Sequence, residues 1–384
     1  MRHATGRYAR PTCRCGSSST FDDTLSRRVR LLRVRLAEFR NYESLDFTPE
    51  AGLNVFVGSN AQGKSNLLEG LAMLATGKSF RAHRESELIR SGAERAEIGG
   101  DAHIAAGNIR LRCTIARTPA GTRKSFEVNG GAVGFARFLG RTRVVTFVPA
   151  DLQLVSGGPV LRRSFLNGAL AQLSPTYYRD LALYQKVVAQ KSALLRGAIA
   201  PDRDLLLAYN DELVRPASAL IAARRAFVDE VAAATADIYA RWRGTHERLG
   251  VTYAPNPEGD VGEALAGAVE SEVRRRTTLV GPHRDDLRLL VDGKPLAAFG
   301  SQGQQRTAVL ALKVAEYDVM RARTADAPIL LLDDVLSELD AERAGGFLAA
   351  VGDFEQAFLT TTELPRDVGA AATWTIRAAT VMPC

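Results

Sequence analysis

The segment that most constrains the fold runs from Asn54 to Leu74 and reads NVFVGSNAQGKSNLLEGLAML. A short apolar run leads into the pattern G-x-x-x-x-G-K-[ST], and leucines at helical spacing follow it. The glycines let the backbone turn tightly, so that its N–H groups can point at phosphate oxygens. The helix behind the turn adds its positive N-terminal end. The segment therefore predicts a buried strand, a phosphate-binding loop and a helix.

This pattern also predicts what the loop residues do. Lys64 is expected to reach the β- and γ-phosphates, and the Ser65 hydroxyl is expected to bind Mg²⁺. No N-K-x-D tetrad for guanine occurs in the chain, which favours ATP as the nucleotide. The predicted nucleotide-binding residues of the loop are Gly58, Ser59, Asn60, Ala61, Gln62, Gly63, Lys64 and Ser65.

Two adjacent acids follow another apolar run, in ILLLDDV. A buried strand that ends at Asp333 would place this carboxylate beside the loop, where it could hold Mg²⁺ together with Ser65. Asp334 comes next and is the predicted catalytic residue, because a carboxylate there could polarise the attacking water. The pair predicts magnesium-dependent ATP hydrolysis.

A third motif predicts how the site is completed. Ser301, Gly303 and Gln304 stand just before and at the start of a helix in FGSQGQQRTAVLALKVAE, so their N–H groups could bind a phosphate. The motif resembles the ABC signature, which would serve the nucleotide of a second subunit. SELD, which ends at Asp340, resembles the D-loop at the same interface. The order of these motifs is that of ABC-type ATPases.

The chain between these motifs changes character. We expect residues 1–28 to lie outside the fold, residues 29–158 to form an ATPase lobe with the phosphate-binding loop, and residues 159–275 to form a helical arm. Residues 276–384 would form the second ATPase lobe. Pro216 is expected to interrupt the arm's long helical pattern, and heptads are not sustained, so no long coiled coil is predicted.

Composition allows a nucleic-acid partner without requiring one. The net charge is +7 and the pI is about 9.4. The four cysteines match neither a disulfide framework nor a zinc site, and no apolar run is long enough to span a bilayer. We therefore expect a cytoplasmic protein. Two basic clusters, in GKSFRAHR and at Arg274–Arg276, could be DNA contacts or solvated surface.

Six segments together resemble the RecF family, bacterial DNA-gap repair ATPases of the SMC-like ABC superfamily. They are EFRNYESLDF, NVFVGSNAQGKSNLLEGLAMLATGKSFR, FVPADLQLVSGGPVLRRSFLN, TLVGPHRDDL, GSQGQQRTAVLALKVAE and LLLDDVLSELD, between about residues 32 and 365.

The resemblance implies an ABC head that dimerises on ATP, holds DNA and opens after slow hydrolysis. It implies gapped or junction DNA as the ligand, a role in DNA replication, DNA damage and the SOS response, and the mediator proteins RecR and RecO as partners that help to load recombinase. It also places Arg40 near the nucleotide.

This chain departs from the wider ABC pattern in two places. Thr360, Thr361 and Thr362 stand where many ABC proteins have a switch histidine, which predicts slow hydrolysis. The Q-loop residue could be Asp151 or Gln153. The alternative function is an ABC-type ATPase coupled to a membrane or other protein partner. An ATPase–nuclease is disfavoured, because too few residues follow Asp340 for a nuclease domain.

Overall fold

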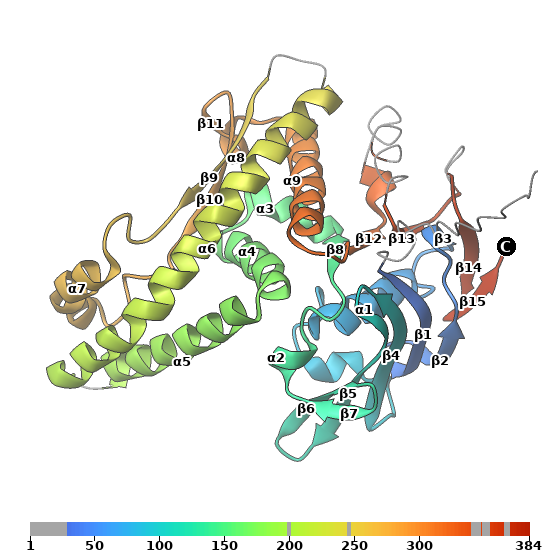
Figure 1. Cartoon of the computed structure of the whole chain (residues 1–384), viewed down its shortest axis with the longest axis horizontal. Coiled ribbons are helices and arrows are strands. Elements are labelled where there is room, and N and C mark those ends of the chain that lie inside the picture. Colours follow the sequence, from blue (N-terminus) through green and yellow to red (C-terminus); the bar gives the residue numbers. More distant parts are fainter. Residues whose placement is uncertain (1–28, 198–200, 244–246, 339–346, 348–353, 365–368) are drawn as a thin grey trace, which may run out of the picture.

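The computed structural model describes residues 29–197, 201–243, 247–338, 347, 354–364 and 369–384. Figure 1 shows two sheets gathered around one helix on one side and a group of long helices on the other. The predicted tail, residues 1–28, and the predicted D-loop residue Asp340 lie outside the described residues. The predicted domain boundaries remain a prediction.

A six-stranded sheet carries the nucleotide motifs, in the order β15-β14-β3-β13-β12-β8. All neighbours in it are parallel except the hairpin β14–β15. β12 is buried along its whole length, as expected for an apolar strand between two parallel neighbours. The strands are β3 (Gly52–Val57), β8 (Val144–Phe147), β12 (Ile329–Asp333), β13 (Gln356–Thr361), β14 (Ala372–Arg377) and β15 (Thr380–Pro383).

An antiparallel sheet faces the first one, in the order β2-β1-β4-β5-β6-β7. Its strands are β1 (Arg30–Phe39), β2 (Tyr42–Phe47), β4 (Arg95–Ile104), β5 (Gly107–Thr118), β6 (Gly121–Val128) and β7 (Gly131–Val133). Burial alternates along β4, so one face packs inward and the other is solvated. The segment EVNGGAV forms the tight hairpin between β6 and β7, with positive φ at Asn129 and Gly130.

Helix α1 (Lys64–Thr76) lies between the two sheets and packs on strands of both. Its buried residues include Leu67, Leu71 and Leu74, which the sequence placed on one helix face. This position fixes the N-terminal end of α1, and with it the phosphate-binding loop, against the carboxyl ends of the parallel strands.

The remaining helices build the arm and connect it to the parallel sheet. The arm has α4 (Pro159–Leu173), α5 (Pro175–Gly197), α6 (Arg203–Arg243) and α7 (Val261–Arg275), with a small sheet of β9 (Leu249–Ala254), β10 (Asp286–Val291) and β11 (Lys294–Pro295). Helix α9 (Gln302–Arg323) packs along α6 and leads into β12, so it joins the two parts (Figure 1). The short elements are α2 (Phe135–Phe138), α3 (Gln153–Ser156), α8 (Leu296–Phe299), η2 (Glu85–Leu88), η3 (Pro149–Leu152) and η4 (Val335–Glu338).

The predicted interruption at Pro216 is wrong. Helix α6 continues through this proline over 41 residues. The lost backbone hydrogen bond and the ring clash cost about 3 kcal/mol. Tertiary packing offsets this cost, because Leu213, Ala217 and Leu220 around the proline are buried in the main core.

A buried ion pair holds the loop before β10 against α6. Arg224 of α6 and Asp285 are 2.7 Å apart, with side-chain exposures of 2% and 0%. Arg224 also donates to the Pro282 carbonyl at 2.6 Å, and the Tyr253 hydroxyl donates to Asp285. Gly281 has a φ of 131°, and a Cβ there would overlap the Tyr184 hydroxyl. The motif GPHRDD therefore fastens the loop before β10 to helix α6.

Candidate active site

The phosphate-binding loop leaves β3 at Gly58 and enters α1 at Lys64, as predicted. Gly63 has a φ of 114°, which favours glycine. A Cβ on Gly58 would stand 2.5 Å from the Ile376 carbonyl oxygen. Both glycines of the motif are therefore required by the local backbone. Between these glycines, the loop residues Ser59, Asn60 and Ala61 are exposed to solvent.

Lys64 is buried, and its ammonium spans the loop. Its Nζ donates to the carbonyls of Gly58 at 2.5 Å and Ser59 at 2.9 Å. Burial lowers the pKa of Lys64, while the nearby charges of Asp334 and Asp333 act in the opposite direction. Lys64, the residue predicted to bind the phosphates, therefore lies close to the predicted acid pair Asp333 and Asp334.

Ser65 and Asp333 meet although 268 positions separate them in the sequence. The Ser65 hydroxyl donates to Asp333 Oδ1 at 2.8 Å. Their closeness follows from the sheet order, in which β3 and β12 are separated only by β13. A hydroxyl and a carboxylate that converge beside a phosphate-binding loop are oxygen ligands of the kind that Mg²⁺ prefers, so these residues fit the ion.

Thr360 connects the two acids. Its hydroxyl donates to Asp333 Oδ1 at 2.8 Å and accepts the Asp334 backbone N–H at 3.1 Å. Asp334 has a φ of 51°, so the chain turns sharply after β12. From the sequence, Thr360 could be interpreted only as a replacement for a switch histidine, so its contact with Asp333 was not predicted. Thr361 donates to the Glu363 carbonyl, and Thr362 is exposed.

Replacing Thr360 with Val is expected to slow ATP hydrolysis about 10- to 100-fold, because valine keeps the shape but removes the hydrogen bond to the Asp333 carboxylate, worth about 1.5–3 kcal/mol. The magnesium concentration for half-maximal activity should rise as well. Steady-state assays over a magnesium titration would measure both. Thr252→Val, an exposed change on β9, is the matched control, and an equal effect of both variants would contradict this role.

The C-terminal hairpin β14–β15 holds the loop from its other side. The Ala378 N–H donates to Gln62 Oε1 at 2.7 Å, and the Ala379 N–H donates to the Gln62 carbonyl at 3.0 Å. Both alanines have positive φ. Sequence reasoning placed no strand here and missed this support.

Arg40 lies next to α1, and its side chain is hydrogen-bonded to Glu69 of this helix rather than to the phosphate-binding loop. Its guanidinium donates to both oxygens of Glu69 at 2.8 and 2.7 Å, and to the Glu87 carbonyl at 3.1 Å. Burial alone would raise the pKa of Glu69, but hydrogen bonds from Arg40 and Ser79 outweigh it and the pKa lies below its usual value. Tyr42, two residues on, donates to the Gly63 carbonyl at 3.0 Å. The nucleotide role of Arg40 remains a prediction.

Ser301 caps the N-terminus of α9. Its hydroxyl accepts the Gln304 N–H at 3.2 Å, and the Ser301 N–H donates to Gln304 Oε1 at 2.6 Å, a capping box. Gln304 also donates to Glu247 at 3.0 Å, and Gly303 lies in the first turn. In Figure 1, α9 begins beside α8 and ends near β8 and β12. Arg306, Val309 and Leu310 follow the motif on α9 and line a small cavity together with Asp333, so the N-terminal half of α9 is the half that lies near the acid pair.

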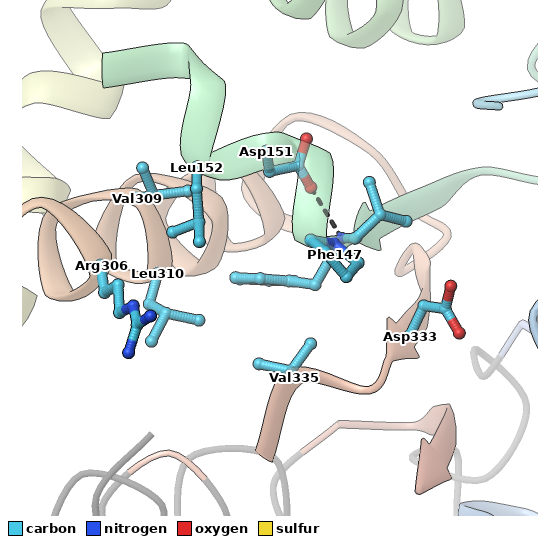
Figure 2. A pocket seen from close by; sticks show the side chains of 10 residues that line it. Phe147, Asp151, Leu152, Arg306, Val309, Leu310, Asp333 and Val335 are labelled. Carbon is cyan, nitrogen blue, oxygen red and sulfur yellow. Dashed lines mark hydrogen bonds between the residues drawn. The ribbon is translucent and has the colours of Figure 1, made fainter. Parts of the chain in front are cut away.

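A small cavity lies behind Asp333. Its volume is about 30 Å³, too small for a nucleotide, and mainly apolar side chains from β8, α9 and the turn after β12 line it. Figure 2 shows the Asp333 carboxylate pointing away from these side chains.

The two candidates for the Q-loop residue lie in different surroundings. Asp151 accepts the Val148 N–H at 2.9 Å, and burial raises the pKa of Asp151, whereas Gln153 is exposed. Which of them is the Q-loop residue stays open.

Comparison with known proteins gives one consistent result. The family described as RecF/RecN/SMC N terminal domain matches residues 30–365. The DNA replication and repair protein RecF of Symbiobacterium thermophilum is 40% identical over 349 residues, which are 87% of this chain and 92% of that protein. RecF of Thermosynechococcus vestitus is 40% identical over 347 residues, with 87% and 91% covered.

Solved structures agree with this result. The recombination mediator protein RecF-ATP in the RecFOR pathway is similar with a TM-score of 0.84 and 28% identity, over 93% of this chain and 98% of that chain. An Smc head bound to the C-winged helix domain of ScpA has a TM-score of 0.55 at 16% identity over 92% and 96%, a likeness of fold. The predicted α/β ABC-type head is thereby confirmed. The chain belongs to the RecF family of DNA replication and repair proteins, ABC-type ATPases related to SMC heads.

Proposed function

We propose that two copies of this protein close over two ATP molecules, hold DNA while closed, and release it after slow hydrolysis. The observation that supports this most directly is the Ser65–Asp333–Thr360 arrangement beside the phosphate-binding loop, together with the capped N-terminus of α9 at Ser301. The chain's own loop already supplies N–H groups for a bound phosphate, so a second group of helix N-terminal N–H groups would be redundant within one chain. A second copy would supply a phosphate for this group, with Ser301, Gly303 and Gln304 completing its site.

In this proposal each group of residues has a separate role in binding and hydrolysing ATP. The loop residues Gly58–Ser65 would hold the phosphates, with the Lys64 ammonium on the β- and γ-oxygens. Ser65 and Asp333 would hold Mg²⁺, which supplies charge neutralisation when bound. Asp334 would accept the proton of the attacking water. Asp340 would lie at the interface between copies.

The relatives' names supply the setting of this activity. RecF proteins are called DNA replication and repair proteins, and the similar structures belong to a pathway named RecFOR. We propose gapped or junction DNA as the ligand, RecR and RecO as partners, and the cytoplasm as the location. Among the described residues, no helix has the length and apolar character needed to cross a membrane. The alternative of a membrane-coupled ATPase finds no support among these relatives.

DNA binding is expected to be about 10-fold tighter with a slowly hydrolysed ATP analogue than with ADP, a coupling of about 1.4 kcal/mol between the two ligands. Binding of a labelled gapped duplex at one stated salt concentration would measure this. Lys64→Met should remove the difference, because it removes the phosphate contact. Lys186→Met, an exposed change on α5, is the matched control. Equal and negligible binding in both nucleotide states would overturn the DNA-binding proposal.

A further inference from the structure

Four arginines gather where α4 meets the loop before β10, and two of them are neutralised. Arg162 binds Asp286 through two hydrogen bonds of 2.7 and 3.0 Å. The buried Arg224 and Asp285 form the ion pair described above. These two pairs account for both carboxylates of the motif GPHRDD.

The other two arginines, Arg163 and Arg284, form no salt bridge among the described residues. Arg163 donates to the Asp285 backbone carbonyl at 2.7 Å. Arg284 donates to the Thr278 carbonyl at 2.6 Å and to the Thr277 hydroxyl at 3.3 Å. Neutral carbonyl and hydroxyl oxygens orient these guanidiniums without cancelling their charge. The cluster therefore keeps two positive charges in excess.

The electrostatic surroundings agree with this excess. Burial and the charge of Arg224 lower the pKa of Arg163, while the charges of Asp286 and Asp285 act in the opposite direction without reversing the shift. Burial lowers the pKa of His283 to about 4, helped by the charges of Arg284 and Arg163, so this side chain is neutral near pH 7. Its Nδ1 lies 2.5 Å from the Tyr184 hydroxyl. The histidine is thus a fixed polar neighbour, and an anion is the ligand that this region favours.

Further cations extend the cluster along the surface. Arg274, Arg275 and Arg276 are exposed at the end of α7, and Thr277, which follows them, is the residue bound by Arg284. Arg284 is exposed and Arg163 is half-buried. Nearby, Glu272 is buried and paired with Lys191 at 2.6 Å, so it does not neutralise these cations. Cations therefore stand at the end of α7, in the loop that follows it and on α4, and these cations are called the cationic strip below.

We propose that Arg163, Arg284 and Arg274–Arg276 contact the phosphodiester backbone of DNA. A strip of several cations fits a polyanion better than a single phosphate, and guanidinium contacts to phosphates bind without reading sequence. The inference rests on the proposed DNA binding and adds to it the arm surface that DNA touches. It also explains why the loop is fastened so firmly to α6, since a rigid loop keeps Arg284 in place.

The test compares the full-length wild-type protein with the double variant Arg163→Gln/Arg284→Gln. The affinity for a gapped duplex is measured at several salt concentrations in the presence of the slowly hydrolysed ATP analogue. Each lost phosphate contact lowers the slope of log K against log salt by about 0.9, so the slope should fall by about 2. Arg163→Lys/Arg284→Lys keeps both charges and should restore most of the slope. The control Arg215→Gln/Arg225→Gln removes two exposed arginines of α6 and should leave the slope unchanged.

The outcomes separate this inference from the proposed function. A wild-type protein that binds DNA, with a glutamine double variant of unchanged slope, overturns the cationic strip alone. An equal loss in the α6 control overturns it too, because net charge would then explain the effect. A wild-type protein that binds no DNA in either nucleotide state overturns both proposals.

Discussion

Asp334→Asn is expected to lower the rate of ATP hydrolysis about 100-fold or more and to leave ATP binding nearly unchanged. The Asp334 backbone is fixed by two hydrogen bonds to Thr360, from its N–H to the hydroxyl at 3.1 Å and to the carbonyl at 3.2 Å. Its carboxylate lies close enough to Lys64 to affect the pKa of that ammonium. Asparagine keeps the shape but cannot accept a proton, and a positioned general base contributes about 10²–10⁴-fold.

Single-turnover hydrolysis and a separate ATP-binding titration would check this prediction. The first should slow and the second should stay constant, because Asp333 still supplies the carboxylate that Ser65 contacts. Asp229→Asn, an exposed change on α6, is the control for loss of one charge. Hydrolysis at the wild-type rate would remove Asp334 from the catalytic role.

The sequence was informative where chemistry depends on neighbouring residues. A phosphate-binding loop needs its glycines and its lysine within eight positions, and a buried strand that ends in two acids is also a local pattern. In the fold the Ser65 hydroxyl and the Asp333 carboxylate lie 2.8 Å apart, which agrees with a buried strand that ends at Asp333 beside the loop. The α/β class, the helical arm and helix α9 could be predicted for the same reason, since helical periodicity and the N-terminal signal of α9 are local.

Contacts between distant segments could not be predicted in this way. The Gln62–Ala378 hydrogen bond joins residues 316 positions apart, and nothing in either local sequence indicates the other. Thr360 reads as an ordinary strand residue until β13 is placed beside β12. Pro216 shows the opposite failure, because a local rule predicted a break that packing on both sides of α6 overrides.

Asp285→Asn is expected to destabilise the protein by about 3–5 kcal/mol, because it leaves a buried guanidinium without its counter-charge. The Arg224–Asp285 pair is almost fully excluded from solvent. Asp285 also accepts from the Tyr253 hydroxyl and from the Asn256 N–H, the latter at 2.7 Å. The loss should loosen the loop Gly281–Asp286 from α6. Urea unfolding followed by circular dichroism would measure the change in free energy of unfolding.

The exposed pair Arg203–Glu270 provides the comparison for this effect. Its side chains are 68% and 76% exposed, so water screens the interaction although the two atoms are only 2.5 Å apart. Glu270→Gln should therefore cost less than about 1 kcal/mol. Comparable losses in the two variants would contradict the view that burial makes Arg224–Asp285 the fastening point of the arm. A large loss confined to Asp285→Asn, together with weakened DNA binding, would connect the rigidity of the loop to the position of Arg284.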